Sequence, residues 1–148
     1  MGPITAFTSF FARYFDVYGR SRRSEFGWMV LIHLTAMVAL YMVIRVFEDG
    51  TVSTAHGDLS AVSSLLISAT SLVWIGMLIP WTTLTVRRFH DMGQSGWLVA
   101  LFAGLWIIPP IGMIGSVVQF FWILFGAGTA GSNAYGHDPR FSGGLEFN

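Results

Sequence analysis

The stretch FGWMVLIHLTAMVALYMVI, residues 26–44, decides the class of fold, because its 19 consecutive residues carry no formal charge. Two longer charge-free stretches follow, 28 residues at 59–86 and 46 residues at 92–137. A hydrocarbon core of about 30 Å is crossed by about 20 helical residues, so each stretch is long enough for a transmembrane helix. The sequence therefore predicts an all-α integral membrane protein.

The composition supports this class and excludes others. Of the 148 residues, 53% are hydrophobic and only 11% are charged, against about 25% charged in a soluble domain. The eight basic residues are all arginine and are balanced by eight acids, so no net basic field attracts nucleic acid. Cysteine is absent, which excludes disulfides and thiolate chemistry. We expect a single membrane domain, residues 1–148, that does not bind nucleic acid.

About four membrane helices are expected. The first two are placed at residues 26–47 and 64–84. The last apolar region is interrupted by the pair Pro109–Pro110, which removes two backbone donors. This break favours a short hairpin with halves at 95–109 and 110–126 over its alternatives, a single kinked span or a re-entrant pair.

The first 25 residues carry a periodic aromatic pattern followed by a basic segment. The aromatic residues recur at helical spacing, which predicts one face of a helix that ends near Gly19. A helix lying in the headgroup plane is favoured over a helix that packs against the bundle. The expected interfacial aromatic residues are Phe7, Phe10, Phe11, Tyr14, Phe15 and Tyr18.

The arginines also predict the orientation in the membrane, because short cytoplasmic loops retain Lys and Arg. Four of them precede the first span, Arg87 and Arg88 follow the second, and the loop between those spans holds three acids. With four spans, both termini and the tail at 127–148 are cytoplasmic. With three spans the tail lies outside. No cleavable signal is evident in the first 16 residues.

The exclusive use of Arg points to more than membrane anchoring, because the planar guanidinium group binds carboxylates and phosphates with two parallel hydrogen bonds. Arg87 and Asp91 are expected to pair at i, i+4 if their helix continues. Three motifs should meet at the cytoplasmic interface: GRSRRSEFGW at 19–28, RRFHDMGQSGW at 87–97 and GSNAYGHDP at 131–139. The expected lipid-headgroup site or structural ion-pair cluster comprises Arg20, Arg23, Arg87, Arg88, His90, Asp91, Asn133, Tyr135 and Asp138.

The same three motifs resemble the YhaH-like family of small bacterial inner-membrane proteins, numbered eight hundred and five among the domains of unknown function. The resemblance covers nearly the whole chain. It implies several spans in the inner (plasma) membrane, and it supplies no reaction, substrate or cofactor.

Other polar groups predict little chemistry. The serine stripe at Ser60, Ser64 and Ser68 is typical of close helix packing, and with His33 and Gln119 it is also the basis of an alternative polar path. The string GAGTAG at 126–131 is followed by turn formers, so we interpret it as a flexible loop and not as a dinucleotide site. No nucleophile with a matching base is evident, and we expect no catalytic residue, cofactor or metal site.

Two functions are therefore carried forward. The favoured one is a non-catalytic membrane protein that binds an anionic lipid headgroup or a membrane protein partner at its Arg-rich face, with a homo-oligomer as one form of such a partner. The alternative is a small transporter or channel component that uses the serine stripe.

Overall fold

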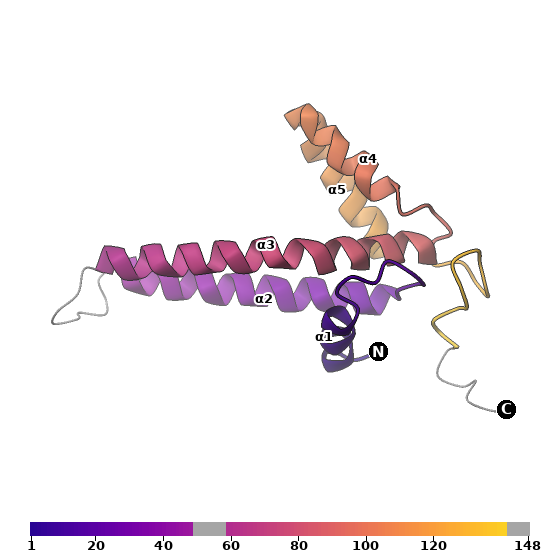
Figure 1. Ribbon diagram of the computed structural model, residues 1–148, viewed down its shortest axis with the longest axis horizontal. Coiled ribbons are helices and arrows are strands. Elements are labelled where there is room, and N and C mark those ends of the chain that lie inside the picture. The colour runs from indigo at the N-terminus through magenta and orange to yellow at the C-terminus, as the bar shows by residue number, and fades with distance from the viewer. Residues whose placement is uncertain (49–58, 142–148) are drawn as a thin grey trace. The chain divides into compact units, whose positions relative to one another are not determined.

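The computed structural model describes residues 1–48 and 59–141 (Figure 1). Of residues 47–48 and 59–63 within these ranges, it describes the backbone alone. The regular secondary structure of these described residues is helical apart from one isolated bridge between Asn133 and Gly136, which confirms the all-α class. The elements are α1 (Pro3–Ala12), α2 (Arg23–Glu48), α3 (Leu59–Asp91), α4 (Leu98–Gly104), a 3-10 turn η1 (Leu105–Ile107) and α5 (Pro109–Phe125).

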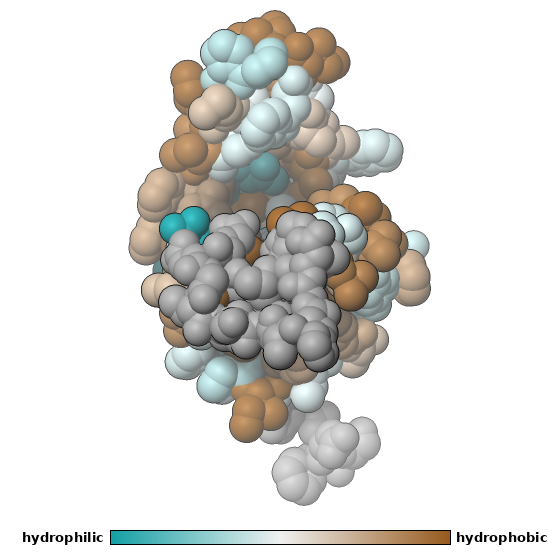
Figure 2. All heavy atoms as spheres, turned by 90° about the vertical axis from the view of Figure 1, so that its left-hand side faces the viewer, coloured by the Kyte–Doolittle hydropathy of each residue, from teal (hydrophilic) through white to brown (hydrophobic). Residues whose placement is uncertain are grey.

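Two of these helices are long and apolar enough to cross a membrane, at Arg23–Val46 in α2 and Ser64–Asp91 in α3. Almost none of either span is buried inside the protein, and hydrophobic residues dominate the coloured surface in Figure 2. The ends complement the helix dipoles, because Glu25 lies in the first turn of α2 and Arg88 in the last turn of α3. Helices therefore cover both expected spans, with longer bounds than the sequence predicts.

The chain divides into two compact units. One contains Met1–Met29 and Pro80–Asn148, and the other contains Val30–Ile79, which includes α2 beyond Met29 and α3 up to Ile79. In the second unit, His33 of α2 meets the ring of Trp74 edge-on, with ring centroids 4.3 Å apart.

The proline pair divides the last apolar region into two helices that pack against each other (Figure 1). The backbone is extended at Ile108, and α5 begins at Pro109, where the missing N–H costs no helical hydrogen bond. Gly112 is buried so closely under Trp106 that an added Cβ would lie 2.8 Å from its Cα. The indole of Trp106 also donates to Ser116 Oγ at 3.0 Å. These contacts form a helical hairpin, which begins at Leu98 because Gly93 has a φ of 70° and the chain turns there.

The first helix is shorter than the aromatic periodicity predicts. It ends at Ala12, and the prediction of a continuous helix to Gly19 is wrong. Thr83 Oγ1 donates to the Pro80 carbonyl of its own helix at 3.0 Å and lies 3.3 Å from the Tyr14 carbonyl and 3.5 Å from the Arg13 carbonyl. Asp16 Oδ1 accepts the Tyr18 N–H at 2.9 Å. These contacts satisfy backbone groups without a further helical turn.

An aromatic core holds the first unit together. Phe10 of α1 is fully buried and meets the ring of Trp81 in α3 at 5.6 Å. Phe26 of α2 also packs edge-on against this indole, with ring centroids 5.9 Å apart. This packing brings the end of α1 and the start of α2 to the C-terminal part of α3, near most of the arginines.

Candidate functional site: an arginine-lined cavity

Asp91, at the C-terminus of α3, is the centre of a buried ion-pair cluster. Arg20 Nε donates to Asp91 Oδ1 at 3.0 Å, and Arg88 Nη1 donates to Oδ2 at 2.7 Å. Asp91 and Arg20 are 5% and 6% exposed, and Arg88 is fully buried. Two guanidinium groups therefore compensate this carboxylate, and we refer to Arg20, Arg88 and Asp91 as the Asp91 cluster.

The Asp91 cluster also holds the segment that follows α5. Arg20 Nη1 donates to the Gly131 carbonyl and Nη2 to the Thr129 carbonyl, each at 2.6 Å. Arg88 donates to the carbonyls of Ile123 and Gly126. Because an arginine fork carries five donors, each guanidinium can bind a carboxylate and backbone carbonyls together. The cluster thus joins the end of α3 to the tail.

Arg87 does not pair with Asp91 as the i, i+4 spacing predicts. Its side chain is fully buried, and its carboxylate neighbour is Glu25 of α2, with Nη1 3.7 Å from Oε1. Glu25 in turn accepts hydrogen bonds from Ser9 at 2.8 Å and from Ser21 at 2.7 Å. The expected pairing is wrong because Glu25, at the start of α2, lies within ion-pair distance of Arg87, and Arg20 and Arg88 bind the two oxygens of Asp91.

The tail itself is ordered by a second set of contacts. The rings of His90 and Tyr135 stack at 3.9 Å, and Asn133 Nδ2 donates to the His90 carbonyl at 2.9 Å. Asp138 accepts the Gly131 N–H at 3.0 Å. The Arg140 guanidinium beside Asp138 holds the pKa of that carboxyl well below its usual range, and the Asp138 carboxylate raises the pKa of Arg140. This pair is therefore charged at every physiological pH.

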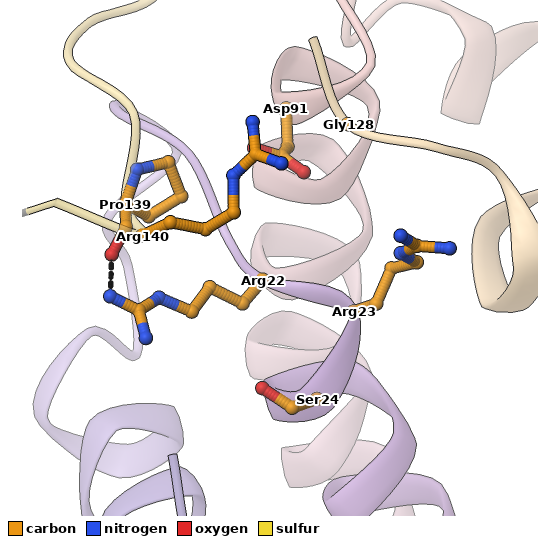
Figure 3. A pocket seen from close by; sticks show the side chains of 7 residues that line it. All are labelled: Arg22, Arg23, Ser24, Asp91, Gly128, Pro139 and Arg140. Carbon is orange, nitrogen blue, oxygen red and sulfur yellow. Dashed lines mark hydrogen bonds between the residues drawn. The ribbon is translucent and has the colours of Figure 1, made fainter. Parts of the chain in front are cut away.

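A cavity of about 250 Å³ lies where these segments meet (Figure 3). We call it the Arg23 cavity. Arg22, Arg23 and Ser24 come from the start of α2, and Asp91 from the end of α3; Arg22 donates a hydrogen bond to the Pro139 carbonyl. The complete lining is Arg22, Arg23, Ser24, Asp91, Gly128, Pro139 and Arg140.

The predicted site residues divide among these groups and do not form one cluster. Arg20, Arg88 and Asp91 are joined directly, Arg87 pairs separately with Glu25, and Arg23 is exposed at the cavity. The remaining predicted residues, His90, Asn133, Tyr135 and Asp138, order the tail through the contacts described above.

Sequence reasoning missed four residues that the geometry singles out: Glu25, Arg22, Arg140 and Gly128. An added Cβ at Gly128 would lie 2.1 Å from Asp91 Oδ2. The GAGTAG string was therefore a signal of close backbone approach, which a glycine permits, as well as of a loop. The other three are charged residues in or beside the motifs. Glu25 and Arg22 are distinguished by long-range partners, whereas Arg140 pairs with its neighbour Asp138.

The predicted interfacial aromatic residues have different surroundings. Phe10 is fully buried, whereas Phe7 and Phe11 on the same helix are 45% and 42% exposed. The residues beyond the helix differ as well: Phe15 and Tyr18 are exposed and Tyr14 is half-buried.

The polar groups of the alternative path lie elsewhere. Ser68 Oγ donates to the Ser64 carbonyl and Ser71 Oγ to the Ile67 carbonyl, each at 2.8 Å, so these hydroxyls bond to their own helix. The side chain of Ser60 lies outside the described residues.

Comparison with known proteins relates the whole chain to one family. The family model described as "Protein of unknown function (DUF805)" matches residues 14–137. Inner membrane protein YhaI of Escherichia coli strain K12 is 32% identical over 135 residues, which cover 91% of this chain and 95% of YhaI. Inner membrane protein YhaH of the same strain is 27% identical over 133 residues, covering 86% and 89% of the two chains. No solved structure matches the chain.

These relatives confirm the resemblance noted in the three motifs and support a location in the bacterial inner membrane. With its apolar helices and a match over most of its length, the chain belongs to the DUF805 family of proteins of unknown function.

Proposed function

We propose that this protein is a non-catalytic inner-membrane protein that binds the anionic headgroup of a membrane lipid in the Arg23 cavity. One observation carries the proposal: three guanidinium groups line a single cavity, and the carboxylate that lines it, Asp91, is already compensated by Arg20 and Arg88. A phosphate oxygen would be a charge-matched acceptor for the arginines that remain.

The charge balance around the cavity supports an anionic ligand. Among the described residues of Met1–Met29 and Pro80–Asn148, seven arginines stand against four Asp or Glu side chains, an excess of three positive charges. Within those ranges no carboxylate pairs with Arg22 or Arg23: Arg22 bonds the Pro139 carbonyl, and Arg23 makes one 3.5 Å contact with the Phe125 carbonyl. An excess positive charge in a partly dry site favours binding of an anion.

The depth of the cavity fits a headgroup. Arg23 begins the first candidate span and Asp91 ends the second, so if both helices cross the membrane the cavity lies near their ends. The arginine distribution supports a topology of four spans, with the α4–α5 hairpin counted as two short ones and both termini cytoplasmic. Basic pockets at the cytoplasmic ends of spanning helices are suited to anionic headgroups. The exposed Phe7 and Phe11 support an interfacial position for α1.

The experiment is native mass spectrometry of the full chain in a mild neutral detergent, titrated with phosphatidylglycerol or with zwitterionic phosphatidylethanolamine. We expect retained phosphatidylglycerol, and Arg23→Gln should weaken its binding about tenfold, the contribution of one charge-assisted hydrogen bond. Arg45→Gln is the matched control, because it removes the same charge from α2 outside this unit. Equal retention of both lipids, or equal weakening by both variants, overturns the proposal.

The serine stripe gives no comparable support to the transporter alternative, because Ser68 and Ser71 already donate to the backbone of their own helix.

A further inference from the structure

A second basic cavity adjoins the Arg23 cavity in the same unit. It has a volume of about 330 Å³ and is formed mainly by α1, the segment after it and the start of α2. Its polar lining is Thr5, Ser9, Arg13, Arg20, Arg22 and Glu25. We call it the Arg13 cavity.

The lining of the Arg13 cavity carries uncompensated positive charge. Arg20 is paired with Asp91, and the carboxylate of Glu25 is held by two serine hydroxyls and lies 3.7 Å from the buried Arg87. Glu25 therefore cannot neutralise the other arginines of the cavity. Arg13 and Arg22 have no carboxylate partner in the part of the chain that the structure describes, so they carry the uncompensated charge of this cavity.

The two cavities share Arg22 and Pro139, whose hydrogen bond therefore lies at the boundary between them. The bond uses one of the five donors of the Arg22 fork and leaves four N–H groups. Among the described residues of this unit, the three arginines without a carboxylate partner are thus distributed in order: Arg23 in one cavity, Arg22 at the boundary and Arg13 in the other.

We propose that the two cavities together bind one lipid that carries two phosphate groups joined by a short bridge, as in diphosphatidylglycerol. This inference rests on the proposed function and specifies its ligand. One phosphate occupies the Arg23 cavity, the other occupies the Arg13 cavity, and Arg22 contacts the ligand between them. Each phosphodiester brings one negative charge to a cavity whose carboxylate is already compensated. A lipid with one phosphate leaves one of the two cavities without an anion.

The test compares three probes on the full chain by native mass spectrometry in the same detergent: diphosphatidylglycerol, phosphatidylglycerol and inorganic pyrophosphate. The parent protein should bind diphosphatidylglycerol about tenfold more tightly than phosphatidylglycerol, because one more charge-assisted contact forms. Arg13→Gln should remove this preference and leave phosphatidylglycerol binding unchanged. Arg23→Gln should weaken the binding of both lipids, and Arg45→Gln should weaken neither.

Arg13 is exposed, so its substitution leaves the packed core intact. Arg13→Lys, which keeps the charge, should restore part of the preference. Equal affinity for the two lipids, or a preference that survives Arg13→Gln, overturns the inference while Arg23-dependent phosphatidylglycerol binding still upholds the proposed function. If Arg23→Gln changes the binding of neither lipid, the proposed function itself fails. If pyrophosphate binds as tightly as the two-phosphate lipid, the ligand is a free diphosphate and the lipid assignment is wrong.

Discussion

Gly128→Ala tests whether the tail and the end of α3 are joined as closely as the structure shows. The new Cβ would lie 2.1 Å from Asp91 Oδ2 and 2.9 Å from its Cγ, far inside van der Waals contact. The carboxylate cannot move aside, because Arg20 and Arg88 bind its two oxygens at 3.0 and 2.7 Å. The tail must therefore separate from α3, or the ion pairs must lengthen.

Either response is costly. Overpacking of a tight site costs about 1–3 kcal/mol, and breaking a buried ion pair costs about 3–5 kcal/mol. A loss of roughly 3 kcal/mol corresponds to a fall in melting temperature of roughly 6–12 °C for a chain of this size. Thermal unfolding of the detergent-solubilised protein, followed by tryptophan fluorescence, measures it. Gly104→Ala is the matched control, because an added Cβ there meets nothing within 4 Å.

A double-mutant cycle isolates the contact itself. With Asp91→Ala as the background, the partner of the clash is gone, so Gly128→Ala should then cost less than about 0.5 kcal/mol. If Gly128→Ala is as stable as the parent, or if it costs the same in both backgrounds, the close approach of Gly128 to Asp91 is refuted.

Three further predictions concern charge, topology and pH. Glu25→Gln should destabilise the protein by about 3–5 kcal/mol, because it leaves Arg87 buried without a counter-charge. Adding Arg87→Met should recover most of this loss in the same melting assay. A double variant that is less stable than the single variant contradicts the pairing of Glu25 with Arg87. A reporter that is active only outside the membrane should be inactive when fused after Asn148 and active when fused at Ser53, and the reverse pattern contradicts the four-span topology. Because the pKa of Asp138 is lowered, the contribution of its carboxylate to stability is present above pH 3.8, the ordinary pKa, and is lost only as the pH falls through the lowered pKa. The Gly131 N–H should therefore keep its hydrogen-exchange protection, corrected for intrinsic rates, from about pH 8 down to about pH 5. Loss of protection within that range contradicts the assignment.

The helical segments of this protein are largely readable in the sequence, since their signals are local. Exclusion of charge from residues 26–44 and 59–86 follows from the cost of transferring charge into hydrocarbon, which acts on each residue separately. The helix break at Pro109 likewise follows from one ring and one missing N–H. The proline pair therefore favours a hairpin in the sequence, and the contact of Gly112 with Trp106 provides the close packing of its two helices.

Local periodicity failed where a distant residue intervened. The aromatic spacing predicts a helix to Gly19, but the helix ends at Ala12, and the carbonyls of Arg13 and Tyr14 lie beside the Thr83 hydroxyl of α3. The spacing of Arg87 and Asp91 predicted a pair in the same way, and Glu25 from another helix replaced it.

The sequence by itself therefore determined which segments are long and apolar enough to cross a membrane, where the last apolar region breaks and which flanks of the apolar segments carry arginine. Only the tertiary structure decided which arginines are compensated and which remain available to a ligand. The physical reason is that an ion pair is chosen by proximity in space: Arg20 reaches Asp91 across 71 positions and the Gly131 carbonyl across 111. Arg13, Arg22 and Arg23 differ from the other arginines of their unit only because no carboxylate among the described residues was brought within reach of them.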